Sequence, residues 1–330
     1  MKKIQVSIFF VLVFLMVSCA VRTLDVQGHR GARGLRPENT LAGFEYAIVL
    51  GVTTLELDIG ISADGVVIVT HNPSIHGDLC LNLDGTQIST DSLGHGPLIR
   101  DLTLDKIKEY DCGSLNPEQA RFSEPPRVNI PGEKMPTLKE VFDLIRKKEN
   151  DVSLNIEMKV DPRYNVTISD SEFVKIVVGF IRREGMTHKV HLQSFNWRTL
   201  EMVKKIAPEI RTAALLGTGS YEPVNDTVPS PWLNEIHFYN TDGTALGILK
   251  EAKAYVDIFS PSWHLIVPED TLYLHSSVNE IQQAGFPVIP WTVNLQKDMK
   301  RLIHLGVDGI ITDYPDSLIG VLDELNLRVR

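Results

Sequence analysis

The feature that most constrains the fold is a regular alternation of short β-branched apolar runs with longer stretches of helical periodicity. The short runs predict buried strands, and the longer stretches predict amphipathic helices. Strands are predicted at 26–29, 54–59, 66–71, 153–158, 190–194, 212–216, 256–260, 288–293 and 309–312. Helices are predicted at 41–50, 138–148, 172–184, 197–206, 244–253, 272–284, 297–305 and 317–325.

This order of elements is typical of a parallel sheet whose strands are joined by crossover helices. About eight strands, closed by helices over roughly 290 residues, fit a (β/α)8 TIM-type barrel. A doubly wound sheet is the alternative, but the first strand-to-helix turn lacks the G-x-G-x-x-G pattern. We therefore expect an α/β fold of the TIM-barrel type over residues 26–330.

The alternation is interrupted once, in residues 73–135, which are rich in glycine and proline and contain one modest helical pattern at 102–110. We expect a small loop-rich insertion subdomain there. Cys80 and Cys112 both lie in it. Small insertions bury little apolar surface, so we predict a Cys80–Cys112 disulfide, with two buried thiols as the alternative.

The N-terminus has the pattern of an export signal. Lys2 and Lys3 precede an apolar run from Ile4 to Val17, which is short for a membrane-spanning helix and ends just before Cys19. The pattern resembles a bacterial lipoprotein signal, with residues 1–18 removed, Cys19 lipidated and residues 19–25 serving as a short tether. We expect an exported lipoprotein, anchored to a membrane in the periplasm or cell envelope. An ordinary buried helix is the alternative.

Composition excludes one class of partner and narrows the metal chemistry. The chain has 33 basic and 42 acidic residues, a net charge of −9 and no long run of Lys and Arg, which argues against a nucleic-acid-binding surface. Its 3 cysteines include no pair with zinc-ligand spacing. Any metal is therefore expected to be held by oxygen atoms.

Acidic side chains stand within otherwise apolar predicted strands. Glu56 and Asp58 are two residues apart and share one face of a strand, and Glu157 and Lys159 do the same on another. These three carboxylates from two separate strands form a hard oxygen donor set suited to Ca²⁺ or Mg²⁺. Unpaired buried charge is costly, which favours such a site over a solvated face.

A hairpin is predicted next to the acidic pair. Asp64 and Gly65 lie between two alternating runs and are typical turn residues. If they are the two residues of the turn, any two residues that face each other across the hairpin have residue numbers that sum to about 129. That register places His71 opposite Asp58.

Histidine and arginine end the first predicted strand. His29 could act as an acid or base, and Arg30 could hold a phosphate. The flanking Gly28 and Gly31 would let a ligand approach the backbone closely. An isolated histidine at a strand end is more often structural, but two histidines, three acids, an arginine and a lysine at strand ends together favour a catalytic site.

In order along the chain, these residues resemble the glycerophosphodiester phosphodiesterase family. The matching segments are His29-Arg30-Gly31, Pro37-Glu38-Asn39-Thr40, Glu56-x-Asp58, His71, Glu157-x-Lys159, Gln193-Ser194-Phe195, Trp291-Thr292-Val293-Asn294 and Asp308-Gly309-Ile310-Ile311-Thr312-Asp313. The insertion after His71 also looks like the extra segment of the family's exported branch.

The resemblance implies a TIM-type barrel, a divalent cation and cleavage of glycerophosphodiesters to glycerol 3-phosphate and an alcohol. It implies that His29 and His71 share the proton transfers while the neighbouring glycerol hydroxyl attacks phosphorus. A cyclic phosphate would form and then be opened by water. Trp291 is a candidate wall for the glycerol carbons and Gln193 a candidate polar liner, although barrel packing explains either equally well.

One position departs from the family pattern: Asn72 stands where an aspartate usually follows the second histidine. An amide keeps a hydrogen bond but removes the negative charge, so the pKa of His71 should be lower than in relatives. The alternatives that remain are a phospholipase C-like or sphingomyelinase D-like lipid enzyme, a glycoside hydrolase that uses Glu56 and Glu157, and an inactive binding lipoprotein. A glycoside hydrolase would leave both histidines without a role.

Overall fold

The structure, a computed structural model, describes residues 23–116, 126–148 and 151–330. The expected signal peptide, Cys19 and most of the tether lie outside these residues. Within the described part of the chain, no helix is long and apolar enough to cross a bilayer.

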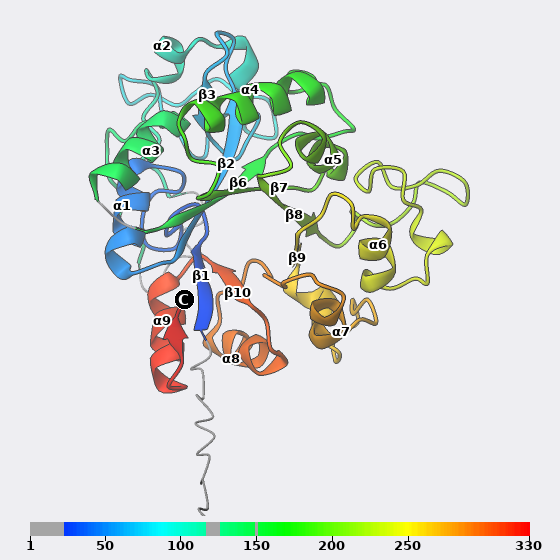
Figure 1. The fold of residues 1–330 in the computed structure, drawn as a ribbon. Helices are drawn as coiled ribbons and strands as arrows, with labels where there is room; N and C mark the ends of the chain where they lie inside the picture. The colour runs from blue at the N-terminus through cyan, green and yellow to red at the C-terminus, as the bar shows by residue number, and fades with distance from the viewer. Residues whose placement is uncertain (1–22, 117–125, 149–150) are drawn as a thin grey trace, which may run out of the picture.

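Seven parallel strands form most of a barrel, as predicted (Figure 1). Neighbouring strands follow the order β10-β1-β2-β6-β7-β8-β9, so each new strand is added beside the previous one except where the chain returns to β1. The bounds are β1 Thr23–Gly28, β2 Thr54–Ile61, β6 Ser153–Met158, β7 Val190–Ser194, β8 Arg211–Leu216, β9 Ile258–Pro261 and β10 Gly309–Thr312.

The segment 288–293 closes the ring although it is not a regular strand. On one side, Ile289 N–H donates to the carbonyl of Phe259 at 2.9 Å. On the other, Ile311 N–H donates to the carbonyl of Pro290 at 3.0 Å. The prediction of a strand here was right in position, but prolines at 287 and 290 lack the N–H groups that a continuous ladder needs.

The helices surround the strands on the outside (Figure 1). Their bounds are α1 Leu41–Leu50, α3 Leu138–Lys147, α4 Asp170–Arg183, α5 Trp197–Ile206, α6 Ala245–Glu251, α7 Val278–Gln283, α8 Gln296–Leu305 and α9 Pro315–Glu324. Helix α7 is shorter than predicted because Ser277 and Glu280 form a capping box that starts it late. A short strand, β11 Arg328–Val329, pairs with β1.

The inside of the barrel is divided into a polar half and an apolar half. Strands β1, β2, β6 and β7 contribute buried polar side chains, including Gln27, Asn155 and Gln193. The opposite half is filled by a separate apolar cluster of Ala213, Ile258, Ile289 and Ile311. Polar groups buried together in this way must find partners among themselves, which fixes their orientation.

The predicted hairpin exists, but its register was wrong by one residue. Strand β3, Val67–Val69, pairs with β2 so that Ile59 lies opposite Val69, and partner numbers sum to 128. The loop has three residues rather than two and ends at Gly65 with φ of 76°. Thr70 therefore pairs with Asp58, and His71 lies one residue further along.

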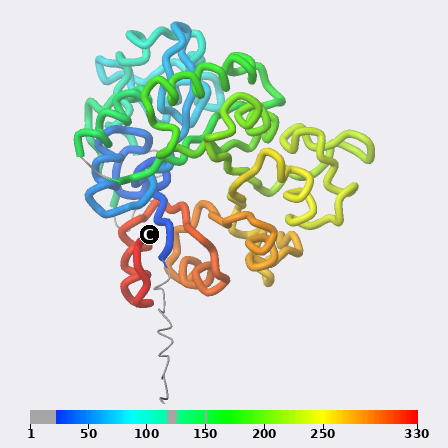
Figure 2. The backbone as a smooth tube through the Cα atoms, viewed as in Figure 1, coloured from blue at the N-terminus to red at the C-terminus, as the bar shows by residue number. Residues whose placement is uncertain are grey.

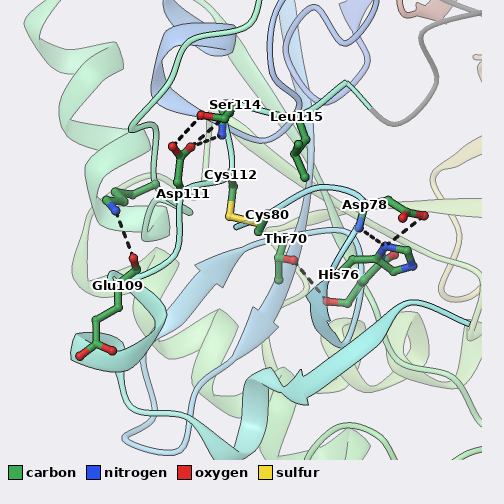
Figure 3. The surroundings of a disulfide bond; sticks show 12 residues. Thr70, His76, Asp78, Cys80, Glu109, Asp111, Cys112, Ser114 and Leu115 are labelled. Carbon is green, nitrogen blue, oxygen red and sulfur yellow. Dashed lines mark hydrogen bonds and ion pairs between the residues drawn. A yellow bond between two sulfur atoms is a disulfide. The ribbon is translucent and has the colours of Figure 1, made fainter. Parts of the chain in front are cut away.

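The described parts of the insertion, residues 73–116 and 126–135, fold beside the barrel, in the cyan region of Figure 2. They contain β4 Ser74–His76, β5 His95–Leu98, the 3-10 helix η1 Ile99–Asp101 and α2 Leu104–Ile107. These elements share a small core with Ile68, Ile75 and Ile107 at its centre. Cys80 and Cys112 belong to that core and are joined by a disulfide (Figure 3).

Candidate active site

Three carboxylates meet at the carboxyl ends of β2 and β6. Each of Glu56, Asp58 and Glu157 offers one oxygen, and these oxygens all lie within 4.8 Å of one another. Their residues are 2%, 1% and 7% exposed, so the charges are shielded from water. Alternation along the strands brings them together, because Glu56 and Asp58 share a face and Asp58 is the register partner of Glu157.

Two cations lie against this cluster. Lys159 Nζ is 2.9 Å from Glu157 Oε1 and 3.7 Å from an oxygen of Asp58. Arg30 Nε is 3.2 Å from the other oxygen of Asp58. Burial would raise the pKa of Asp58, but Arg30, His71 and Lys159 instead hold it well below its ordinary value.

The other two acids have raised pKa values, because nearby cations compensate their burial and mutual repulsion only in part. Burial, together with the charge of Asp58, raises the pKa of Glu56 well above its ordinary value. Burial also raises the pKa of Glu157 to about 7, against the opposing charge of Lys159. A cluster of hard oxygen donors whose own charges repel is a good fit for a divalent cation, which would remove that repulsion.

His29 is held by a carboxylate at the end of the last barrel strand. Its Nδ1 lies 2.6 Å from Asp313 Oδ1, and its Nε2 lies 3.9 Å from Glu56 Oε2. Asn294 Nδ2 donates to the second oxygen of Asp313 at 2.6 Å. Burial lowers the pKa of His29 from its ordinary value, whereas Asp313 opposes that shift.

His71 is held by an amide instead. Its Nδ1 lies 2.8 Å from Asn72 Oδ1. Burial, with the charges of Lys159 and Arg30, lowers the pKa of His71 to about 3. The imidazole is therefore neutral at ordinary pH. The causes of this shift do not include Asn72, so the expected difference from relatives stays a prediction.

Arg30 is fixed from several sides. Its N–H donates to Glu56 Oε2 at 2.9 Å and its guanidinium donates to Glu38 Oε1 at 2.7 Å. Arg33 donates to the other oxygen of Glu38 at 2.6 Å. The two arginines hold the pKa of Glu38 far below its usual range despite burial, so Glu38 is a permanent anion that orients both.

The glycines around His29 serve the chain's own backbone. A Cβ atom on Gly28 would lie 2.1 Å from the carbonyl oxygen of Gly31. Gly31 has φ of 91° and its Cβ would lie 2.9 Å from the backbone of Gly43 in α1. The chain's own backbone therefore requires glycine at both positions, and close approach of a ligand stays a prediction.

The two residues predicted to line the substrate site, Gln193 and Trp291, have different surroundings. Gln193 is 1% exposed and its Nε2 donates to Glu56 Oε1 at 2.7 Å, so it contacts an acid of the cluster. Trp291 is partly buried and donates its ring N–H to the carbonyl of Ser260 at 2.8 Å. Its ring meets Phe195 edge to face at 5.4 Å.

Sequence reasoning assigned no role to Glu38, Asn39, Asn294 or Asp313. Asn39 Nδ2 donates to Asp58 Oδ2 at 3.0 Å, so all four side chains hold a residue of the site in place. Each had a signal, because each belongs to one of the short motifs quoted above. Residue spacing alone gave no partner for them: Asn39 meets Asp58 across 19 positions of sequence and Asp313 meets His29 across 284.

Comparison with known proteins gives a consistent result. The family model described as "Glycerophosphoryl diester phosphodiesterase family" matches residues 29–317. A glycerophosphodiester phosphodiesterase from Caldanaerobacter subterraneus subsp. tengcongensis is 31% identical over 92% of this chain and 98% of its own. The crystal structure of a glycerophosphoryl diester phosphodiesterase from Silicibacter pomeroyi, itself assigned only by similarity, has a TM-score of 0.77 and 29% identity. It covers 94% of this chain and 96% of its own.

A more distant solved structure shares the fold. An Oleispira antarctica phosphodiesterase, solved with sn-glycerol-3-phosphate as product, has a TM-score of 0.63 at 20% identity. The alignment covers 92% of this chain and 97% of that one.

Proposed function

The chain belongs to the glycerophosphoryl diester phosphodiesterase family, and we propose that it hydrolyses glycerophosphodiesters to sn-glycerol 3-phosphate and an alcohol with a divalent cation, Ca²⁺ or Mg²⁺. The observation that carries this proposal is the buried triad of Glu56, Asp58 and Glu157 beside two histidines. A phosphodiester is an anion that resists attack, so a site that cleaves it must neutralise charge and manage protons.

Glu56, Asp58 and Glu157 would hold the cation. When bound, it would neutralise charge on the phosphoryl oxygens and so lower the barrier to attack. Arg30 and Lys159, which already flank the acids, would hold the phosphate from the other side. Trp291 presents an apolar ring that could contact the glycerol carbons, and Gln193 keeps Glu56 in position.

The two histidines are suited to different roles. Asp313 supplies a negative charge that favours a proton on His29, so His29 would begin as the general acid. Donation from His71 Nδ1–H to the Asn72 oxygen leaves Nε2 with a free lone pair, so His71 would begin as the general base.

The proposed chemistry has two steps. His71 takes the proton of the glycerol hydroxyl next to the phosphate, a new O–P bond forms, and the bond from phosphorus to the alcohol breaks with a proton from His29. Water then opens the cyclic phosphate with the histidine roles reversed. Bis(p-nitrophenyl) phosphate has no such hydroxyl, so we expect no turnover. Cleavage at a rate similar to a glycerol diester would disprove this route.

The deciding experiment measures glycerol 3-phosphate released from glycerophosphocholine and glycerophosphoethanolamine by the purified protein. We expect release that EDTA abolishes and Ca²⁺ or Mg²⁺ restores, and that Glu157→Gln loses. Release that survives EDTA would contradict the cation, and no release with either ion would contradict the activity. Lysophosphatidylcholine in parallel tests the lipid-enzyme alternative, which requires the lipid to be the better substrate.

We also propose export and lipidation. The support is the charged and apolar N-terminal pattern that ends at Cys19, together with a disulfide, which persists in oxidising compartments. In a bacterial host, mass spectrometry should find a mature chain that begins with lipidated Cys19. Cys19→Ser should move the protein from the detergent phase to the aqueous phase, and an unprocessed N-terminus on the native chain would disprove the proposal.

A further inference from the structure

A chain of hydrogen-bonded side chains crosses the inside of the barrel. At one end, Gln27 Nε2 donates to Asp25 Oδ2 at 2.8 Å. In the middle, Asn155 Nδ2 donates to Gln27 Oε1 at 2.8 Å and to Gln193 Oε1 at 3.0 Å. At the other end, Gln193 Nε2 donates to Glu56 Oε1 at 2.7 Å.

The chain joins the two mouths of the barrel. Glu56 belongs to the acidic cluster at the carboxyl ends of the strands. Asp25 lines a cavity of about 830 Å³ at their amino ends, and it also accepts hydrogen bonds from the hydroxyls of Thr53 and Thr54 at 2.7 and 2.8 Å. Asp25 is thus a firmly held end point, far from the site.

The two carboxylates at the ends determine which way each side-chain amide group in the chain is oriented. A carboxylate accepts hydrogen bonds only, so Gln193 must turn its NH₂ group to Glu56 and Gln27 must turn its own to Asp25. Both carbonyl oxygens then face Asn155. Between two acceptors, the central side chain must supply two donors, which the NH₂ group of Asn155 does.

In this orientation, the amide oxygen of Asn155 is left without a hydrogen bond. Its Oδ1 is buried and has no hydrogen-bond partner among the described residues. An unsatisfied buried acceptor costs free energy, so an apolar side chain would serve packing better at this position. The residue therefore has a use that depends on its two N–H groups.

We propose that Asn155 is a positioning residue for the cation site: it fixes the direction of Gln193, which in turn holds Glu56 in the orientation that binds the cation. This inference rests on the cation site of the proposed function. Outer partners of this kind orient the ligands of metal sites, and their loss typically weakens metal binding by about 10- to 100-fold.

The test uses the full-length protein and isothermal titration calorimetry with Ca²⁺ or Mg²⁺. Asn155→Asp keeps the shape but replaces the double donor with an acceptor, and we expect cation affinity to fall by about tenfold or more. Gln27→Met breaks only the distant half of the chain, so we expect a smaller loss. At saturating cation, kcat of both variants should return close to the native value, because neither residue touches the substrate.

His191→Asn is the matched control. His191 is the register partner of Asn155 on β7, and its buried Nε2 makes no hydrogen bond with the residues that the structure describes. We expect the cation affinity of His191→Asn to stay within about twofold of native, whereas Asn155→Asp should lose about tenfold. An equal loss in this control, or native affinity in both chain variants, would overturn the positioning role. If the native protein itself binds neither ion, the proposed function fails instead.

Discussion

His29 Nδ1 lies 2.6 Å from a carboxylate oxygen of Asp313, which is itself fully buried and held by Asn294. The matching atom of His71 meets the neutral oxygen of Asn72 at 2.8 Å. The two catalytic candidates thus differ in the charge behind the ring. In the proposed mechanism, that difference divides the acid role from the base role, and it can be tested at each ring separately.

Asp313→Asn should weaken the general acid. Burial lowers the pKa of His29 while Asp313 opposes it, so removal of this charge lowers that pKa further. An acid must be protonated to act, so activity should be lost at a lower pH on the basic side of the profile. We expect kcat to fall by about 10²- to 10⁴-fold. A pH–rate profile with an unchanged basic limb would contradict the assignment.

Asn72→Asp should change the acidic side of the pH–rate profile. A carboxylate behind His71 would raise its pKa from about 3. A base must be unprotonated to act, so activity should disappear at a higher pH on the acidic side. The same pH–rate measurement checks this, with Asn72→Ser as the control that adds no charge. If both variants shift equally, the charge is not the cause.

The sequence identified the barrel because its signals are local. Periodicity placed β6, β7 and β10 at their observed bounds, since each strand is a short buried run between clear helices. It could not place the hairpin register, because the loop also includes Ala63, and one extra loop residue shifts every pair. The irregular segment at 288–293 was found by its apolar pattern, although its prolines prevent a regular ladder.

The acidic cluster was equally predictable, because side chains two apart on a strand share a face. The side chains that hold the histidines and the acids in place could not be predicted. Asp313 meets His29 across 284 positions of sequence, and Gln193 meets Glu56 across 137. Only the closure of the barrel brings such pairs together, so spacing carries no information about them.

The disulfide should matter for stability more than for catalysis. Cys80 and Cys112 are 32 positions apart and belong to the small core of the insertion, and neither is part of the acidic cluster. Loss of a cross-link over a loop of this size costs about 3–4 kcal/mol in the chain-entropy description. We expect the double Cys→Ser variant to melt several degrees lower by calorimetry, with kcat at 25 °C near native. An unchanged melting temperature would show that the cross-link adds nothing.

Cation binding should control how stability depends on pH. Burial raises the pKa of Glu157 to about 7 and that of Glu56 well above its ordinary value. A group whose folded pKa is raised gives stability below its unfolded pKa, near 4.5, and loses it as pH rises through the folded value. In EDTA, the melting temperature should therefore fall by a few degrees between about pH 5 and pH 8.

Added Ca²⁺ or Mg²⁺ should reverse this fall, and by more at pH 8 than at pH 5, because ligand carboxylates must be ionised to bind. Glu157→Gln removes one of the two titrating groups and one ligand, so it should weaken the pH dependence in EDTA and abolish most of the stabilisation by the cation. Asp143→Asn is a suitable control, since this exposed acid lies on α3 and pairs with Lys139. A melting temperature that rises with pH in EDTA would show that the carboxylates are already compensated by Arg30 and Lys159, leaving no electrostatic reason for the cluster to bind an ion.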